Sequence, residues 1–500
     1  MSVHEPQQAD PGALGSKAFR GGRLLAAGTV VDRLARLGRN MLLARVILPD
    51  DFALMAITLV VIALFTALTE VGVAQAVIQN RRGSTPEFLN VAWWFGVVRG
   101  LVVAVMGVLL AGPIARFYDK PALEPLLLVA PAIVVFTGLT SPRIYALQRQ
   151  FRFGATLWTM QGAGLLGTAM TIVLGLLWQN VWALVLGAVF EAFARFVLSF
   201  VLCPVRPRLH LDRESTRDLF RFSRGMAGLP LMTLLIMQAD VFVLGKVIPD
   251  YQLGLYTLAI ALAAFPLTLF SKVVQPLVVP ILATFQDDHP GMRASVLQLS
   301  RLVWSFGLPL TTVMSIASAP LLALIYGPPF AEAAPAFSLY SAFCIVYMAS
   351  MVTFSVYLAL ARPGLQRRFT FVRAAIVVVA LYPLSVLWGS PGAALTLLVA
   401  MLVAMAVQLV NLHKVIGLPV AAYLATMRPG LLASVLVAIP TALLVLVAPT
   451  PGWADVLLSA ALGAATWAVL LFRERRALRQ LRSAGAPPSP AGDQTLEEQP

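Results

Sequence analysis

Charged residues are scarce in this chain. Asp, Glu, Lys and Arg make up only 12% of its 500 residues, whereas 59% are hydrophobic. Soluble domains contain about 25% charged residues, so the chain lacks the polar surface that a protein of its length needs in water. Its mean hydropathy of +0.83 agrees with this, and lipid is the expected solvent for most of it. We predict an integral membrane protein without a soluble domain large enough to fold alone.

Residues typical of redox, metal and catalytic sites are also few. The two cysteines, Cys203 and Cys344, lie inside or beside apolar runs, so no disulfide framework is expected. The four histidines are scattered over tails and loops, so we expect no metal site and no cofactor. No P-loop, nucleophile elbow or Gly-rich dinucleotide motif follows a strand. The first apolar run is interrupted by charges and does not resemble a signal peptide. The pattern therefore favours a protein that is not an enzyme.

Long hydrophobic runs are abundant. A helix that crosses the hydrocarbon needs about 20 mostly apolar residues, and runs of this kind predict an all-α protein with about 14 transmembrane helices. The predicted spans are 22–46, 52–78, 89–114, 123–146, 155–177, 181–203, 221–247, 252–280, 298–320, 333–360, 369–388, 392–413, 430–449 and 453–472.

The distribution of Lys and Arg predicts the topology. With the N-terminus in the cytoplasm, nearly every cation-rich loop, such as 204–224, falls on the cytoplasmic side. The opposite side receives only Arg45, Arg116, Lys120 and Lys246. Both termini are therefore predicted to be cytoplasmic. The net charge of +14 is explained by anionic lipid headgroups, so nucleic acid is not an expected partner.

Two short matches indicate an internal duplication. ARVILPDDFALM (44–55) matches GKVIPDYQLGLY (245–256), and QRQFRF (148–153) matches QRRFTF (366–371). Both pairs fall at equivalent places in the topology, so we predict two parallel six-helix lobes, between which such transporters bind substrate. The predicted organisation is an N-terminal cytoplasmic tail (1–20), a first lobe of helices 1–6 (21–203), a basic cytoplasmic linker (204–220), a second lobe of helices 7–12 (221–415), helices 13 and 14 (430–472) and a cytoplasmic tail (473–500).

Ten charged residues fall inside the predicted spans and away from the ends of those spans. Each costs roughly 2.5–3.5 kcal/mol at a helix centre, so exposing all ten to lipid would cost on the order of 30 kcal/mol. Most must face a wet cavity, pair with one another or lie near an interface. They are Asp32, Arg33, Arg36, Arg39, Glu70, Arg99, Glu191, Arg195, Asp240 and Lys272.

The first predicted helix carries a polar stripe. At 100° per residue, its polar residues fall within an arc of about 120°; they are Thr29, Asp32, Arg33, Arg36, Arg39 and Asn40. One interpretation is a cavity wall that binds an anion such as phosphate, which suits the arginine fork. The other is snorkelling toward headgroups together with a pair between Asp32 and an arginine.

The remaining intramembrane charges also have two interpretations each. Glu191 and Arg195 are spaced i, i+4, which favours a salt bridge within one helix. Arg99 and Lys272 are either cavity ligands or partners for Glu70 or Asp240. These two acids either couple transport to a proton or cation, or neutralise the arginines.

Several stretches resemble the Wzx-type lipid-linked oligosaccharide flippases, in the polysaccharide transport branch of the MOP superfamily. The resemblance covers about residues 15–415, and one departure is Ala53, where the family usually has Gly. The stretches are LLARVILPDDFALMAI (42–57), LTEVGVAQAVIQ (68–79), QADVFVLGKVIPDYQLGLYTLAIALAAFP (238–266) and VVQPLVVPILATFQDD (273–288).

The resemblance implies a bundle of 12 or 14 helices in the bacterial inner membrane. It implies that the bundle flips undecaprenyl-pyrophosphate-linked glycan from the cytoplasmic to the periplasmic leaflet, for exopolysaccharide, capsule or O-antigen. The family pattern places Arg33, Arg36 and Arg39, together with Lys272, in a cationic central cavity. It also implies a polysaccharide polymerase and a chain-length regulator as partners. Two alternatives are a cation-coupled exporter of small molecules, similar to the MATE branch, and a membrane polymerase or ligase. The arginines oppose the first, and the duplication and short outer loops oppose the second.

Overall fold

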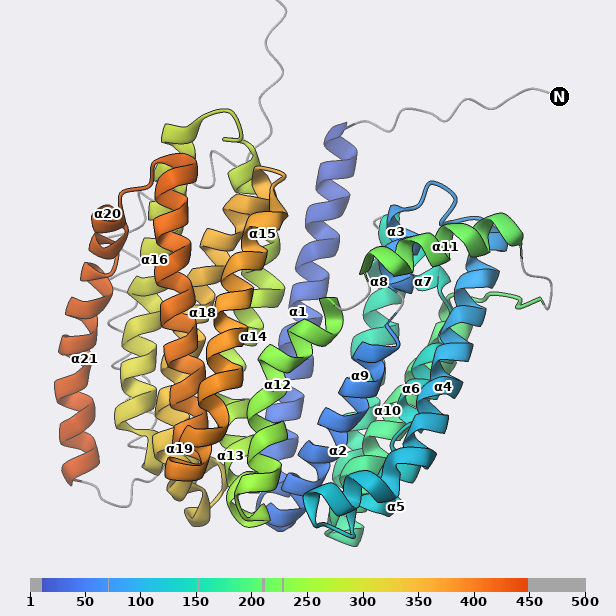
Figure 1. Ribbon diagram of the computed structural model, residues 1–500, viewed down its shortest axis with the longest axis horizontal. Helices are drawn as coiled ribbons and strands as arrows, with labels where there is room; N and C mark the ends of the chain where they lie inside the picture. Colours follow the sequence, from blue (N-terminus) through green and yellow to red (C-terminus); the bar gives the residue numbers. More distant parts are fainter. Residues whose placement is uncertain (1–10, 71, 151–152, 209–211, 227–228, 448–500) are drawn as a thin grey trace, which may run out of the picture. The chain divides into compact units, whose positions relative to one another are not determined.

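The computed structural model describes residues 11–70, 72–150, 153–208, 212–226 and 229–447, in which every regular element is a helix (Figure 1). Nine of the described helices are long and apolar enough to cross a membrane, or ten if one bent pair counts as a single span. The predicted all-α, multi-pass membrane fold is confirmed. The total of 14 spans stays a prediction, and its last span (453–472) lies outside the described residues.

The elements before residue 212 are mostly α-helices with one π-helical turn, η1. They are α1 (Pro11–Leu43), α2 (Pro49–Leu68), α3 (Val73–Gln79), α4 (Pro86–Tyr118), α5 (Leu123–Val129), α6 (Ala132–Leu139), α7 (Arg143–Arg149), α8 (Phe153–Leu157), η1 (Trp158–Gly162), α9 (Ala163–Trp178) and α10 (Val181–Leu202).

The later elements include a second π-helical turn, η2, and two 3-10 turns, η3 and η4. They are α11 (Arg213–Met226), α12 (Leu229–Val247), α13 (Asp250–Ala263), α14 (Phe265–Leu269), η2 (Phe270–Val274), α15 (Gln275–Ala283), α16 (His289–Ile316), α17 (Ser318–Tyr326), η3 (Pro328–Ala333), α18 (Ala334–Ala359), η4 (Pro363–Leu365), α19 (Gln366–Ile416), α20 (Val420–Ala425) and α21 (Arg428–Val447).

Local sequence explains where several helices begin and bend. α2 starts with Pro49 and two aspartates in its first turn, which suits a proline-fixed φ and the positive end of the helix dipole. α4 follows Thr85, whose hydroxyl accepts a hydrogen bond from the Phe88 amide at 3.3 Å, as an N-cap does. α19 contains Gly389 at φ 62° and ψ −137°, a conformation that is open to glycine and divides α19 into two arms.

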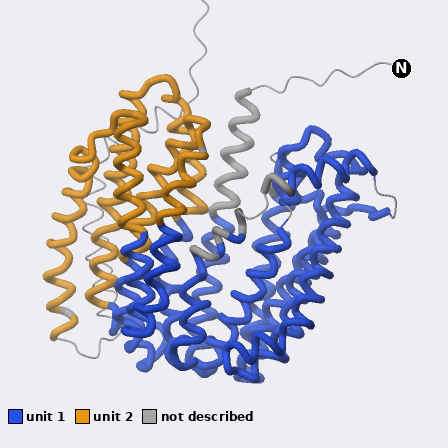
Figure 2. Tube along the Cα trace, in the orientation of Figure 1, with its two compact units in different colours: residues 1–269, 318–341, 373–400 blue, residues 270–317, 342–372, 401–500 orange. Residues whose placement is uncertain are grey.

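The chain divides into two compact units (Figure 2). The first comprises residues 1–269, 318–341 and 373–400, and the second comprises 270–317, 342–372 and 401–500. In the first unit, α10 packs on α6 and α9, α4 packs on α6, and α2 packs on α12 and α13. In the second, α16 packs on α21. The predicted lobe boundaries stay a prediction.

The second unit contains a polar contact between helices. Ser350 of α18 donates a hydrogen bond to Gln408 of α19 at 2.9 Å, and both side chains are buried. Buried polar groups of this kind are tolerated in an apolar bundle when they are paired.

The turns of the predicted duplication lie side by side in the first unit. Gly254 of α13 approaches α2 so closely that a Cβ there would lie 1.8 Å from the Pro49 carbonyl oxygen. Two ion pairs flank this contact, one between Lys120 and Asp250 and one between Lys246 and Asp119. The two matching segments therefore form one end of the first unit.

The predicted linker contains a helix that covers the other end. α11 contacts α3 and α4, and Leu219 joins a buried apolar cluster with Phe88 and Val91. Arg82 forms ion pairs with Asp212 at 3.5 Å and Glu214 at 2.5 Å. The hydrogen bond to Glu214 raises the pKa of Arg82 above its ordinary value, so this guanidinium stays charged.

Candidate functional site

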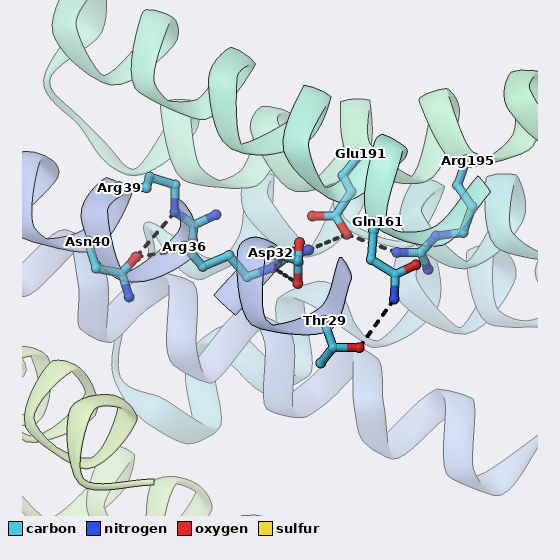
Figure 3. Close-up of polar contacts among 8 residues, drawn as sticks. All are labelled: Thr29, Asp32, Arg36, Arg39, Asn40, Gln161, Glu191 and Arg195. Atoms are coloured by element: carbon cyan, nitrogen blue, oxygen red, sulfur yellow. Dashed lines mark hydrogen bonds and ion pairs between the residues drawn. The ribbon is translucent and has the colours of Figure 1, made fainter. Parts of the chain in front are cut away.

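The polar stripe of α1 forms an ion network with α10 (Figure 3). Arg36 Nε donates to both carboxylate oxygens of Asp32, at 3.1 and 3.0 Å. Arg36 Nη2 donates to Glu191 Oε1 at 2.8 Å, and Arg195 Nη2 donates to the same oxygen at 2.8 Å. The expected pair of Glu191 and Arg195 is thus present, and it extends to α1.

Small residues on α9 make room for this network. A Cβ on Gly164 would lie 2.4 Å from Asp32 Oδ1, and one on Gly167 would lie 2.4 Å from Glu191 Cβ. Contacts under about 3 Å between such atoms are forbidden by sterics. The two glycines therefore let α1 and α10 bring their acids to the same face of α9.

Arg39 differs from Arg36 because it is bound to a neutral side chain. Its Nε and Nη2 atoms donate to Asn40 Oδ1 at 3.2 and 3.0 Å. Within the described part of the chain Arg39 forms no ion pair. Its positive charge is therefore not offset by a bound carboxylate.

These side chains line a cavity of about 400 Å³ in the first unit. Its ionic lining consists of Arg36, Arg39, Arg195 and Glu191. Together with Asp32, which is bonded to Arg36, three arginines stand against two carboxylates, a net charge of +1. The other lining residues are threonines, Asn40 and apolar side chains from α2, α6, α10 and α13: Phe52, Met55, Ala56, Leu59, Ile133, Thr137, Thr171, Leu184, Ala188, Ala192, Thr257, Leu258 and Ala261. The site is a cationic patch between apolar walls.

Arg33 and Arg99 are not among the residues that line this cavity. Arg33 Nε is buried and finds no hydrogen-bond partner among the described residues. Arg99 Nη1 forms an ion pair with Glu70 at 3.0 Å, one of the two partners considered from the sequence. It lines a separate small cavity of about 70 Å³ with Tyr145.

Asp240 and Lys272 lie elsewhere. Asp240 is only 1% exposed and accepts a hydrogen bond from the Tyr256 hydroxyl at 2.6 Å. Among the described residues it has no cationic partner. Lys272 is exposed on η2, in the second unit. The structure thus brings together Asp32, Arg36, Glu191 and Arg195, with Arg39 on the same cavity.

Sequence reasoning missed the threonines of the cavity, Thr137, Thr171 and Thr257. Thr171 donates to the Gly167 carbonyl of its own helix at 2.7 Å, as threonines in apolar helices commonly do. A single threonine in a long apolar run carries no signal of what it faces. Only the packing of α6, α9 and α13 places these three threonines on one cavity.

The fold defines the class of protein. The chain aligns with the lipid II flippase MurJ in an inward closed conformation at a TM-score of 0.71 and 14% identity, over 91% of this chain and 100% of that one. It also aligns with an inward-facing multidrug resistance MATE family transporter of the MOP superfamily, at a TM-score of 0.59 and 14% identity, over 77% and 94% of the two chains. The chain has the fold of the MOP-superfamily membrane transporters.

Sequence comparison then places it more narrowly. Residues 42–335 match the family described as polysaccharide biosynthesis protein, and the chain belongs to that family. It is 25% identical over 336 residues to the lipopolysaccharide biosynthesis protein WzxC of Escherichia coli strain K12, covering 67% of this chain and 68% of WzxC. It is 23% identical over 301 residues to the succinoglycan biosynthesis transport protein ExoT of Rhizobium meliloti strain 1021, covering 60% of each. The family predicted from the sequence is confirmed, and the solved structures that the chain resembles are a flippase and transporters rather than enzymes.

Proposed function

We propose that the protein is a flippase for polyprenyl-pyrophosphate-linked oligosaccharides. It moves complete repeat units from the cytoplasmic to the periplasmic leaflet of the bacterial inner membrane by alternating access, for exopolysaccharide, capsule or O-antigen. Both termini are cytoplasmic in this proposal. The names of the relatives support the substrate class, since one acts in lipopolysaccharide biosynthesis and another in succinoglycan transport.

The observation that carries the proposal is the charge of the 400 Å³ cavity. A pyrophosphate diester carries about two negative charges, and arginine forks match phosphate oxygens in two-point contacts. The lining offers three arginines, and the carboxylates of Glu191 and Asp32 offset two of these charges, so a net charge of +1 remains and Arg39 is the arginine without a bound carboxylate. Apolar walls strengthen this attraction, because the local dielectric constant is lower than that of water.

The arginines have different roles in this proposal. Arg36 is held by Asp32 and Glu191, so it positions the network and offers its remaining N–H groups to the ligand. Arg39 makes its bonds to the neutral Asn40, so it is the main contact for pyrophosphate. Arg195 shares Glu191 and contributes from α10.

The two other intramembrane acids, Glu70 and Asp240, also have different roles in this proposal. Glu70 is paired with Arg99, which favours a structural role for both. Asp240 is buried against a tyrosine hydroxyl rather than a cation, so it remains the candidate for coupling to protons or another cation. Lys272 contributes to the substrate path in the proposed mechanism. A polymerase and a chain-length regulator are the proposed partners that use the flipped units.

The test is a deletion strain complemented with variants. Loss of surface polymer, together with accumulation of a complete lipid-linked repeat unit measured by mass spectrometry, is the expected phenotype of the deletion. Arg39→Ala should fail to restore polymer at normal protein levels. Arg116→Ala is the matched control, because the side chain of this exposed arginine donates a hydrogen bond to the Gly112 carbonyl of its own helix, at 3.4 Å, and forms no ion pair among the described residues.

Two other outcomes would contradict the proposed function or the proposed pyrophosphate site. Normal polymer in the deletion strain, with no second flippase gene in the genome, would favour a small-molecule exporter of the MATE kind. Full activity of Arg39→Ala would remove the cavity as the pyrophosphate site.

A further inference from the structure

A second, mostly polar cavity lies at the far end of α13. Its volume is about 170 Å³, and it is formed by the first two turns of α13, the turn η3 and the kink of α19. The residues that line it are Gln252, Leu255, Glu332, Ala333, Trp388, Gly389, Ser390 and Pro391. The Lys/Arg pattern predicts this end of the helices to face the periplasm.

An accessible tryptophan forms one wall of this cavity. Trp388 is 58% exposed, although it follows a long apolar run. Its position depends on the next residue, because Gly389 adopts φ 62° and ψ −137° and turns the chain sharply there. A tryptophan face carries partial negative charge that attracts the C–H groups of a ligand.

The remaining groups can both donate and accept hydrogen bonds. Gln252 supplies an amide and Ser390 a hydroxyl, and Glu332 supplies a carboxylate. Glu332 lies near the Tyr251 hydroxyl. Among the described residues that line this cavity none carries a positive charge, so a phosphate is a poor ligand.

A flat aromatic face beside neutral donors and an acceptor fits a neutral polyol. A sugar ring has an apolar C–H face for the indole and hydroxyl groups for the amide, hydroxyl and carboxylate. A small organic cation would also meet a tryptophan and a carboxylate. The amide and serine would then have no role, so the polar lining favours the sugar.

The two cavities share one helix. α13 supplies Gln252 and Leu255 here, and Thr257, Leu258 and Ala261 to the arginine cavity. At 1.5 Å rise per residue, Gln252 and Ala261 are about 13 Å apart along the helix. A lipid-linked glycan that leaves the arginine cavity toward the periplasm would meet the second cavity next.

We propose that this second cavity is a glycan-binding subsite on the periplasmic side, with Trp388 as the stacking platform and Glu332, Gln252 and Ser390 as partners for sugar hydroxyls. The inference rests on the proposed flippase function. It adds a site that binds the sugar rather than the pyrophosphate.

The chain contains its own control for an alternative role of Trp388. Tryptophans at helix ends often anchor a protein at the membrane interface. Trp178 also follows an apolar run at the predicted outer end of a helix, and it is 47% exposed. If Trp388 is only an anchor, the two tryptophans should respond alike to substitution.

The first experiment measures binding by the full-length protein in lipid nanodiscs. The probe is a water-soluble oligosaccharide made by partial hydrolysis of the strain's own surface polysaccharide, and saturation-transfer NMR reports its contact. Trp388→Ala should weaken binding about fivefold or more, as loss of one aromatic contact implies. Trp388→Phe should keep most of the binding, and Trp178→Ala should keep all of it.

Several results would overturn the subsite. One is no binding of the oligosaccharide by the wild-type protein. Another is equal loss in Trp388→Ala and Trp178→Ala, which would identify both as interface anchors. Choline binding that depends on Trp388, without sugar binding, would identify a cation site instead. Glu332→Gln gives a second variant that keeps the side-chain shape, and it should weaken sugar binding while the protein keeps its thermal stability.

Polymer output in the complemented deletion strain separates the two proposals. If the deletion strain neither loses polymer nor accumulates the lipid-linked unit, the flippase function fails. If it does both, and Trp388→Ala restores polymer as fully as Trp178→Ala does, only the subsite fails. The expected result is several-fold less polymer with Trp388→Ala at equal protein levels.

Discussion

Glu191 is the acid that links Arg36 to Arg195 in the ion network, so we expect Glu191→Gln to lower the thermal stability of the protein. One oxygen of Glu191 accepts from both Arg36 and Arg195, at 2.8 Å each. In Glu191→Gln, Arg36 keeps Asp32, whereas Arg195 loses the one ion pair it makes among the described residues. The variant therefore leaves an uncompensated, mostly buried guanidinium.

The size of the effect follows from burial. The Glu191 side chain is 14% exposed and the two arginines are 26% exposed. Removing one partner of a buried pair costs roughly 3–5 kcal/mol. The partial exposure here places the estimate near the lower value, about 3 kcal/mol. At about 2 °C per kcal/mol for a large domain, the Tm should fall by about 6 °C.

The assay is thermal unfolding of the purified protein in detergent, followed by fluorescence-detected gel filtration. Glu124→Gln is the matched control, because this carboxylate is exposed on α5 and forms no ion pair among the described residues. The double variant Glu191→Gln with Arg195→Gln should be more stable than Glu191→Gln alone, because it removes the stranded cation. An unchanged Tm in Glu191→Gln, or a double variant less stable than the single one, would refute the reasoning.

Three further predictions concern the rest of the first unit. Lys120→Glu should lower the free energy of unfolding by about 1 kcal/mol, and adding Asp250→Lys should restore it in the same unfolding assay. If the second substitution restores nothing, the ion pair makes no contribution to stability. Gly254→Val should reduce folded protein strongly, by a few kcal/mol of strain, because its side chain would overlap the Pro49 carbonyl; normal yield and Tm on gel filtration would contradict that close contact. Asp240→Asn should keep the fold yet abolish any dependence of transport on a proton gradient, measured in proteoliposomes with an imposed pH difference; an unchanged dependence would exclude Asp240 as the coupling group.

The membrane fold was predictable because hydrophobicity acts over short stretches of sequence. A run such as 181–203 has too few polar groups for water, and the structure places α10 there, at Val181–Leu202. The pairing of Glu191 with Arg195 was predictable for a similar reason, because residues four apart meet on one helix face. The family was predictable from motifs near the helix ends.

The partners of these charges across helices could not be predicted in the same way. From the sequence, Arg33 and Arg36 were equivalent members of one stripe. In the structure Arg36 joins two carboxylates while the Nε of Arg33 is buried without a hydrogen-bond partner among the described residues. Arg33 and Arg36 are three positions apart on one helix, yet their environments differ, because Arg36 reaches Glu191 and Arg33 does not.

The sequence by itself determined that lipid is the solvent, that helices are the elements and that cations gather on one face of α1. These properties depend on transfer free energy and helical periodicity, which each segment carries alone. The tertiary structure decided which charges cancel, since an ion pair between Arg36 and Glu191 requires two helices to pack within reach of one another. It decided this through glycines such as Gly167, whose missing side chain sets how closely α9 and α10 approach. The net charge that the cavity offers to a ligand therefore belongs to the packing of the helices, and no single helix contains it.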